Sequence, residues 1–538
     1  MLFNSIEYLF FLPIVFLIYW AIGYAKIDGL LQLKMQNAFV VVASYIFYGW
    51  WDWRFLILIA FTSLCSYASG ILIERGKQKH GIQQSPNSDS SSIDPQSACE
   101  QAPGQTTAQS CAADTLPDTS QKHASLTKSI KNINSAKAWM ITNIVINLGI
   151  LATFKYYDFF VSEFGALFGV STDSLLLRII LPVGISFYTF QALSYSIDVY
   201  RGKIEPTKDI IAFLAFIAFF PQLVAGPIER ATNLLSQFLQ NRKFTYEQGV
   251  DGMRQILWGL FKKIVVADNC ATYVDQVWAA YDTQTGSTLL LAAVLFAFQI
   301  YGDFSGYSDM AIGTAKLFGI KLMRNFNNPY FSRDIAEFWR RWHISLTTWF
   351  RDYVYVPLGG SRVNKQITMR NTCIVFLLCG LWHGANWTFI AWGVYHALLF
   401  LPLILLGRKR KYTNPVAEGL LLPTWKECVQ IFCTFFLVVL GWIIFRAETV
   451  SQSWEILRQM CSHSLWTMPY IGSRSMIIVT VFAIAFMMLV EWVQREEQHG
   501  LALSSLCSRT MRYTVYLLLI AMMLWNTGSG AEFIYFQF

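Results

Sequence analysis

Long runs of apolar residues, separated by short polar or basic segments, recur along this 538-residue sequence. A helix needs roughly 17–25 such residues to cross the hydrocarbon core of a bilayer. The pattern therefore predicts an all-α polytopic membrane protein with about ten or eleven transmembrane helices, plus re-entrant or interfacial helices. The apolar runs lie at 9–25, 38–48, 55–72, 139–160, 175–200, 289–301, 372–382, 388–406, 429–445, 476–493 and 513–525.

Three apolar segments carry interruptions. Pro182 and Gly184 predict a kink inside the run at 175–200, where the freed backbone groups need protein or water partners. Proline and glycine break the short run at 210–223, which predicts a re-entrant segment. At 254–266, two lysines follow aromatic residues, a mixture typical of an interfacial helix.

Residues 76–138 differ from the rest, since they include no Phe, Trp or Tyr and are rich in Ser, Gln, Asp, Pro and Thr. Such a segment cannot bury enough apolar surface to offset its ordering entropy, so we expect a disordered loop, and the lysines near its ends favour the cytoplasm. The chain is thus expected to divide into N-terminal transmembrane helices at 1–75, a cytoplasmic insertion at 76–138, and a catalytic core with C-terminal transmembrane helices at 139–538.

Composition supports a membrane protein and excludes several other classes. The chain is 54% hydrophobic and 14% charged, whereas soluble domains carry about 25% charged residues. The net charge of +8 fits loop lysines and arginines on the cytoplasmic side, which predicts both termini on the outer side. The start of the chain lacks the basic region of a signal peptide, so we expect a retained span. We expect no nucleic-acid partner, no metal and no nucleotide motif, because no basic face, ligand spacing or glycine-rich loop supports one.

The stretch 333–387 combines charges, aromatics and two histidines, His343 and His383. Ionisable residues at membrane depth are costly, so they face the protein interior, a water-filled cavity or the interface, and they mark a functional site by default. On one continuous helix, Trp339, His343, Thr347 and Phe350 would share a face. Glu337 and Arg341, four positions apart, would pair on another.

His383 ends an apolar run without charges, and Asn386 and Trp387 follow it by three and four positions. A neutral imidazole in an apolar pocket can act as a base. A core histidine bonded to a carbonyl is the alternative interpretation of the same residue.

Several blocks together resemble the membrane-bound O-acyltransferase (MBOAT) family, most closely its bacterial alginate O-acetylation branch. They lie at 181–201, 225–228, 301–313, 325–360, 381–387, 392–396 and 533–538. The resemblance implies tilted helices around a central tunnel, a cytoplasmic acyl thioester donor, and acceptor chemistry on the outer side. It also implies that His383 is the near-invariant family histidine and His343 the second one. The insertion at 76–138 departs from the branch.

These expectations define candidate roles for individual residues. His383 is expected to be the general base, and His343 either assists catalysis or lines the substrate path, while His396 is expected to be structural. Asn386 and a nearby Trp indole are candidate donors to the oxyanion. The candidate substrate-binding residues are Trp342, Asn386, Asp303, Arg340 and Arg341. For Asp303, a hydrogen-bonded scaffold that breaks its helix is the favoured alternative. Arg340, Arg341 and Arg351 either hold donor phosphates or form ion pairs with Glu337 and Asp352.

The leading functional hypothesis is an O-acyltransferase of the bacterial cytoplasmic (inner) membrane, with no bound cofactor. It would move acetyl from acetyl-CoA toward an exported polysaccharide, through an extracytoplasmic acetyltransferase or polysaccharide-export partner, while surrounded by membrane lipid. The alternatives are D-alanyl transfer to teichoic acid from an acyl-carrier donor, and O-acetylation of peptidoglycan. A transporter with a histidine proton relay is the alternative from another class, and the absence of visible internal repeats counts modestly against it.

Overall fold

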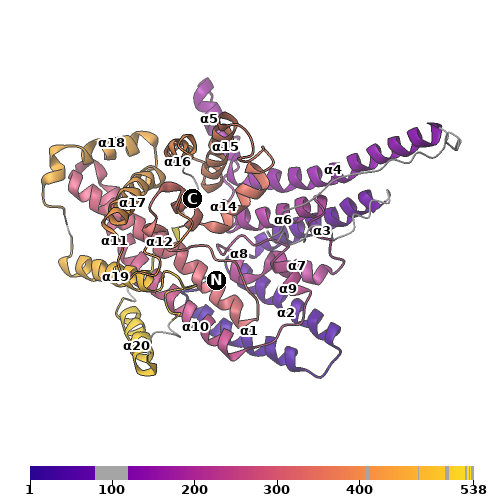
Figure 1. Ribbon diagram of the computed structural model, residues 1–538, viewed down its shortest axis with the longest axis horizontal. Helices are drawn as coiled ribbons and strands as arrows, with labels where there is room; N and C mark the ends of the chain where they lie inside the picture. Colours follow the sequence, from indigo (N-terminus) through magenta and orange to yellow (C-terminus); the bar gives the residue numbers. More distant parts are fainter. Residues whose placement is uncertain are drawn as a thin grey trace, which may run out of the picture.

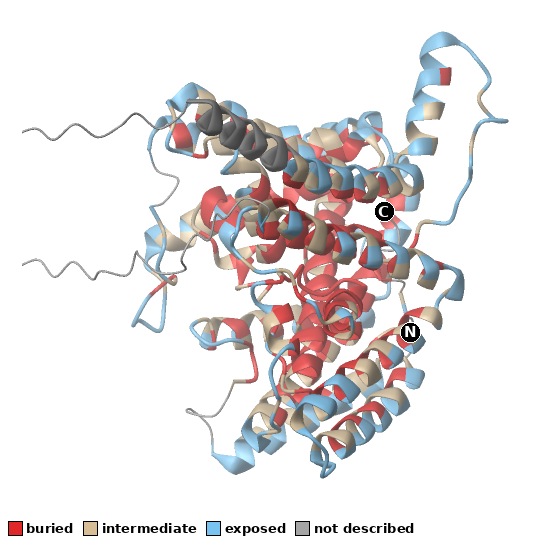
Figure 2. Cartoon of the chain, turned by 90° about the vertical axis from the view of Figure 1, so that its right-hand side faces the viewer, coloured by how far each residue is buried: buried red, intermediate tan, exposed pale blue. Residues whose placement is uncertain are grey.

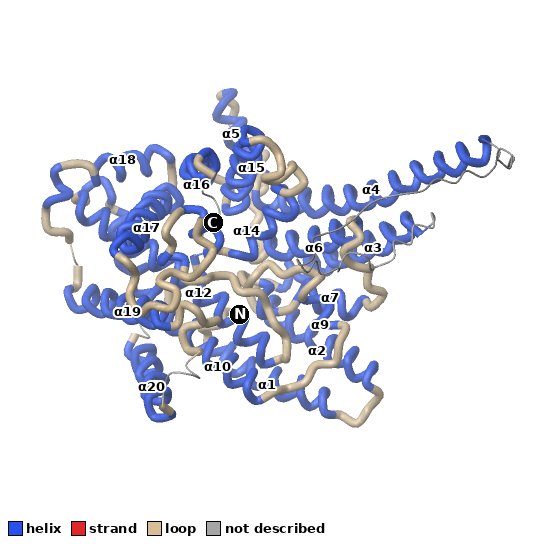
Figure 3. The backbone as a smooth tube through the Cα atoms, in the orientation of Figure 1, coloured by secondary structure: helices blue, strands red, loops and turns tan. Residues whose placement is uncertain are grey.

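The computed structural model describes residues 1–78, 119–407, 411–470, 472–502, 508–526, 530–531 and 533–534, and side chains from residue 135 onward in the second range. Every long regular element in these ranges is a helix (Figure 3), which confirms the all-α fold class. The helices are α1 (Ile6–Tyr24), α2 (Gly29–Gly49), α3 (Leu56–Gln78), α4 (Thr119–Lys155), α5 (Tyr157–Phe168), α6 (Ile185–Tyr200), α7 (Ile210–Ala218), α8 (Phe220–Leu223), α9 (Leu234–Phe238), α10 (Tyr246–Phe261), α11 (Asp268–Ala279), α12 (Gly286–Leu317), α13 (Ile335–Arg341), α14 (Ile344–Phe350), α15 (Lys365–His383), α16 (Trp387–Leu405), α17 (Trp425–Arg446), α18 (Val450–Met460), α19 (Arg474–Val493) and α20 (Arg509–Trp525).

Eight helices in the described ranges are long and apolar enough to cross a membrane, so the protein is a multi-pass membrane protein. They comprise α1, α2, α3 with its preceding turn, the second half of α4, α12, α16, α17 and α19. Two of the other expected spans are shorter, since α6 has 16 residues and α20 has 17. In Figure 1, α4 runs beside α3 and extends beyond the body of the molecule.

The insertion is only partly described. Residues 79–118 of the expected loop lie outside the described residues. The remainder is helical, since 76–78 end α3 and 119–138 form the first part of α4, so the prediction of a loop is wrong there. Lys, Ala, Ser and Ile recur in this segment, and a helix can propagate through such residues when it continues into an apolar span.

Helix α12 is the buried centre of the fold, because 83% of the residues in its most apolar 18-residue stretch are buried (Figure 2). It continues without interruption through 302–309, where the sequence predicted a break. Its glycines allow α10 to approach closely: a Cβ on Gly306 would lie 2.7 Å from the carbonyl oxygen of Gly259, and a Cβ on Gly313 would lie 2.5 Å from that of Gly252. Glycines inside a helix therefore permit close packing here and do not end it.

Two lysines follow α10 in a π-helical segment, Lys262–Ala267, and both are buried. Lys263 pairs with Asp303 at 2.8 Å and Asp268 at 2.9 Å, while Lys262 pairs with Asp309. The prediction of an interfacial helix here is wrong, because carboxylates from α12 neutralise both ammonium groups inside the protein.

Candidate active site

His343 lies at a break between two short helices. α13 ends at Arg341 and α14 begins at Ile344, and His343 has left-handed backbone angles of φ 44° and ψ 54°. The expected continuous helix, with four residues on one face, is therefore wrong. The break forms because another segment takes over the backbone hydrogen bonds: Ile344 donates to the carbonyl of Asn325 at 2.8 Å, and Asn327 donates to that of Arg341 at 2.9 Å. The expected Glu337–Arg341 ion pair is confirmed at 2.9 Å.

The His343 ring is buried in an aromatic box. Its ring centroid lies 4.7 Å from that of Phe304 and 5.7 Å from that of Trp382, both edge-on. Its Nδ1 lies 3.1 Å from Oδ1 of Asn325. The sequence showed the aromatic character of this site but not Asn325, since that residue precedes the histidine by 18 positions.

His383 ends α15 and is also buried. Its ring lies 5.0 Å from Trp382, 5.2 Å from Trp392 and 5.2 Å from Phe445, all edge-on. Trp382 therefore contacts both histidines, and the structure brings His343 and His383 together around one indole ring. Little water reaches such a site, so electrostatic interactions inside it are stronger than in solution.

Lys155, the last residue of α4, and Tyr156, which follows it, hold the C-terminus of α15. The ammonium of Lys155 donates to the carbonyls of Trp382 and His383, both at 2.8 Å, and the hydroxyl of Tyr156 donates to the carbonyl of Leu381 at 2.6 Å. The last carbonyls of a helix have no partners within it, and a cation there is favourable. From the sequence alone, Lys155 is a single charge near the end of the apolar run at 139–160.

Trp392 contributes an unused donor next to His383. Its side chain is 0% exposed, and within the described ranges its indole N–H has no hydrogen-bond partner. An unpaired buried donor costs about 1–3 kcal/mol, so such groups in a native fold call for an explanation. His396, one helical turn further on, accepts a hydrogen bond at Nδ1 from the indole of Trp339 at 3.4 Å.

The other candidate residues have partners within the protein. Trp342 is buried, with its ring 5.0 Å from Phe326 and 4.9 Å from Trp442. Asn386 begins α16: its Oδ1 accepts from the Thr388 backbone at 3.0 Å, and its amide donates to the carbonyl of Glu448 at 2.9 Å.

Asp303 and the two arginines of α13 are similarly engaged. Asp303 pairs with Lys263, and its Oδ2 accepts from the backbone N–H of Ile534 at 2.6 Å, so it anchors the C-terminal segment. Arg341 pairs with Glu337, and Arg340 donates to the backbone carbonyl of Tyr412.

A basic cluster surrounds Tyr353, directly after α14. Its cations are Arg201, Lys203, Arg230 and Arg351, and its carboxylates are Asp198 and Asp352. The guanidinium of Arg230 pairs with Asp352, and Tyr353 donates to Asp198 at 2.6 Å. Four cations against two carboxylates leave a positive excess. Of the three arginines proposed from the sequence for donor phosphates, only Arg351 belongs to this cluster.

In the part of the chain that the structure describes, no group of three His, Cys, Asp or Glu side chains is arranged to hold a metal ion. The donors gathered around Trp382 are imidazoles and indoles. That set suits proton transfer and hydrogen bonding to a reacting carbonyl.

Comparison with known proteins agrees with this chemistry. Residues 205–441 match the profile described as MBOAT, membrane-bound O-acyltransferase family. The chain is 36% identical over 470 residues to "Probable alginate O-acetylase AlgI" of Pseudomonas aeruginosa, covering 87% of this chain and 76% of that protein. It is 35% identical over 353 residues to "Peptidoglycan O-acetyltransferase" of Helicobacter pylori (60% and 64%). It is 31% identical over 285 residues to "Teichoic acid D-alanyltransferase" of Streptococcus thermophilus (49% and 68%).

Proposed function

This chain belongs to the membrane-bound O-acyltransferase family, and we propose from that premise that it moves acetyl from cytoplasmic acetyl-CoA toward hydroxyls of an exported polysaccharide. In this proposal the enzyme works in the bacterial cytoplasmic membrane, together with an extracytoplasmic acetyltransferase or polysaccharide-export partner. The observation that carries the proposal is the pair of buried histidines around Trp382, in a chain with 36% identity to an alginate O-acetylase.

The proposed step is attack of an acceptor hydroxyl on the thioester carbonyl carbon. The proton of the hydroxyl passes to the ring of His383 as the C–O bond forms, and the carbonyl oxygen becomes an oxyanion. The C–S bond then breaks, and His383 returns the proton to the leaving thiolate. The indole N–H of Trp392 is a suitable donor to the oxyanion, because it is buried beside His383 and has no other partner in the described ranges.

The basic cluster around Tyr353 supports a donor that carries phosphate. Its positive excess suits the phosphates of coenzyme A, since guanidinium groups bind phosphate through paired hydrogen bonds. The cluster follows the seven-residue helix α14, which begins next to His343. In this proposal the phosphate end of the donor binds in the cluster and its thioester lies at the histidines.

A transfer assay tests the donor and the reaction together. Purified protein in nanodiscs is given labelled acetyl-CoA and a soluble polysaccharide acceptor, with or without the partner domain. Label on the acceptor is expected. Turnover with a D-alanyl carrier protein and none with acetyl-CoA would instead support D-alanyl transfer, and binding without any transfer would contradict an enzyme.

A matched pair of arginines tests the cluster. Arg351 and Arg54 are comparably exposed, at 59% and 61%, and each pairs with an aspartate one or two positions away in the sequence. Arg351→Gln is expected to raise KM for acetyl-CoA about tenfold or more with a smaller effect on kcat, because a hydrogen bond to a charged group is worth about 1.5–3 kcal/mol. Arg54→Gln is expected to leave both constants unchanged. Equal effects of the two variants on KM would show that the cluster does not bind the donor.

A further inference from the structure

We propose that Asn325 is a positioning residue that holds His343 in the tautomer with its hydrogen on Nδ1, so that Nε2 accepts a hydrogen bond from a substrate N–H or O–H. The inference rests on the proposed acyl transfer for its role in catalysis. The tautomer itself follows from the hydrogen bonds around Asn325.

The backbone N–H of Ser345 fixes the orientation of the Asn325 amide. That N–H is always a donor, and it lies 3.3 Å from Oδ1 of Asn325, while the Ser345 hydroxyl donates to the same oxygen at 2.9 Å. The amide nitrogen of Asn325 donates to Oγ of Ser308 at 3.1 Å. Reversing the amide would set an N–H against the Ser345 N–H, so the oxygen belongs on the side of His343.

This orientation determines which nitrogen of His343 carries the hydrogen. Oδ1 of Asn325 can only accept, and Nδ1 of His343 lies 3.1 Å from it, so Nδ1 carries the hydrogen. In the neutral ring, Nε2 then carries the lone pair. The left-handed backbone of His343 and its two flanking short helices keep the ring at this amide.

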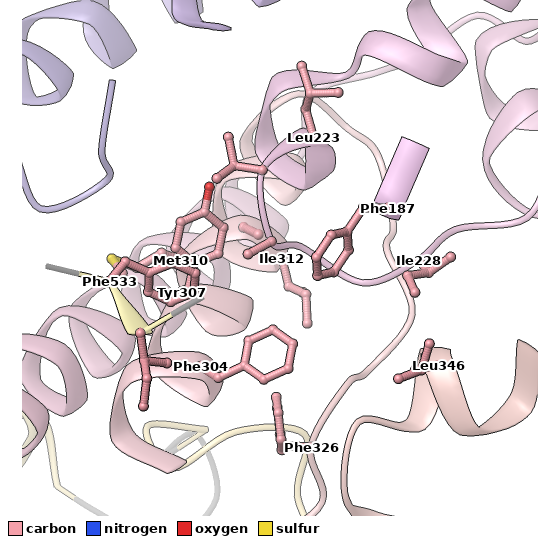
Figure 4. Close-up of a cluster of buried hydrophobic side chains, with 14 of the residues drawn as sticks. Phe187, Leu223, Ile228, Phe304, Tyr307, Met310, Ile312, Phe326, Leu346 and Phe533 are labelled. Carbon is pink, nitrogen blue, oxygen red and sulfur yellow. The ribbon is translucent and has the colours of Figure 1, made fainter. Parts of the chain in front are cut away.

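Nε2 of His343 is buried and has no hydrogen-bond partner within the described ranges. Three of the rings around it come from separate segments: Phe187 of α6, Phe304 of α12, and Phe326 after it. Figure 4 shows these three side chains turned toward one another. Helix α15 contributes Trp382 and the titratable ring of His383. The three phenylalanines offer no hydrogen bond, and neither the indole of Trp382 nor the ring of His383 makes one to Nε2, so we assign the partner of Nε2 to the substrate.

The assignment gives the two histidines different tasks. A ring whose free nitrogen is an acceptor cannot donate to the oxyanion, so His343 orients a substrate N–H or O–H while His383 exchanges the proton. It also makes activity depend on a neutral His343. Asn325 thereby acts on the reaction through His343, without touching the reacting atoms.

Solid-state NMR tests the tautomer without any acyl-transfer assay. The protein is labelled with ¹⁵N-histidine and reconstituted in liposomes, and the His343 signals are identified by their loss in His343→Gln. The expected spectrum has a protonated Nδ1 and an unprotonated Nε2, with a shift toward protonated Nε2 in Asn325→Leu. A protonated Nε2 in the wild type would overturn the inference, whatever reaction the protein catalyses.

Kinetics of two Asn325 variants test the role. Asn325→Leu is expected to lower kcat about 10²–10⁴-fold with little change in KM for the donor. Asn325→Asp keeps the acceptor, so it is expected to retain more activity, while the acid limb of its pH–rate profile moves to higher pH because an anion beside Nδ1 favours the charged ring.

Asn147 offers the matched control, since it is fully buried in a polar cluster with Asn143 and Ser66, between α3 and α4. Asn147→Leu is expected to leave the pH profile in place, whatever it does to stability. An unshifted acid limb in Asn325→Asp, or equal kcat losses in both leucine variants, would reduce Asn325 to a structural residue.

Discussion

The ammonium of Lys155 donates a hydrogen bond of 2.8 Å to the backbone carbonyl of His383, although the two residues are 228 positions apart. A second bond of equal length joins it to the carbonyl of Trp382. One charge from the end of a membrane span thus fixes both the proposed base and the ring that contacts His343. The position of the candidate site depends on these hydrogen bonds between the end of α4 and the end of α15.

Replacing Lys155 is expected to affect stability and activity together. Lys155→Met keeps the length of the side chain but leaves two helix-terminal carbonyls without a donor, each at a cost of about 1–3 kcal/mol if buried. We expect a lower melting temperature and a reduced kcat, with partial rescue by Lys155→Arg. Lys137→Met, an exposed position on the same helix, is the control and should behave as wild type. Full activity of Lys155→Met would show that this cap does not position His383.

Glu229 is expected to give the stability of the protein a pH dependence. Burial raises the pKa of its carboxyl from the ordinary 4.5 to about 7, against the opposing hydrogen bonds from the Met323 backbone and the Asn233 side chain. Between these two pH values the folded state keeps a proton that the unfolded state has released. Stability from this group is therefore full below about pH 4.5 and is lost as pH rises to about 7.

Thermal unfolding in detergent at several pH values measures this effect. The melting temperature of Glu229→Gln minus that of the wild type is expected to increase from pH 5 to pH 8, because the variant has no proton to lose. Glu247→Gln, at an exposed carboxyl, is the control, and its difference should stay constant. A constant difference for Glu229→Gln as well would mean that its folded-state pKa is not raised.

The sequence predicts the helices well where one segment alone decides the outcome. Apolar runs locate most of the long helices, and the spacing of Glu337 and Arg341 predicts their ion pair. The predictions fail where a distant segment decides. The break at His343 requires backbone partners at Asn325 and Asn327, and the burial of Lys262 requires Asp309 of α12.

The candidate site shows the same division. His343 and His383 are recognisable because a histidine among aromatics and apolar residues is unusual in a membrane chain. Asn325 and Lys155 are not, because their side chains act on residues 18 and 228 positions away. The free indole N–H of Trp392 is equally invisible, since a tryptophan in a span is usually a packing residue.

Trp392→Phe isolates the contribution of the indole N–H, because the ring is retained. Removing one donor to an oxyanion typically costs about 10²–10³-fold in kcat, and we expect a loss of that size with nearly unchanged KM. Trp278 is a matched control, since its indole N–H is also buried without a partner in the described ranges, on α11. Equal kcat values for Trp392→Phe and Trp278→Phe would exclude Trp392 as the donor.

Glutamine substitutions separate the roles of the two site histidines. His383→Gln keeps polarity and similar volume but has no basic nitrogen, so it is expected to abolish detectable transfer, at least the 10²–10⁴-fold typical of a lost acid–base group. His343→Gln offers a carbonyl oxygen that can still accept a hydrogen bond. It is therefore expected to reduce transfer without abolishing it. Donor binding, measured separately, should remain near normal in both variants.

His396→Gln completes the series, because His396 is as buried as the other two and its Nε2, like that of His343, has no partner in the described ranges. Its Nδ1 accepts the hydrogen bond from Trp339, however, so in the neutral ring Nε2 carries the hydrogen and offers no lone pair to a substrate. We expect this variant to have a lower melting temperature and a less affected kcat. That result distinguishes a packing histidine from one that touches substrate. Near wild-type turnover by folded His383→Gln would mean that His343 or a group of the partner, and not His383, takes the proton. Complete loss of transfer in His343→Gln, together with an active His383→Gln, would mean that His343 is the base and His383 the orienting residue.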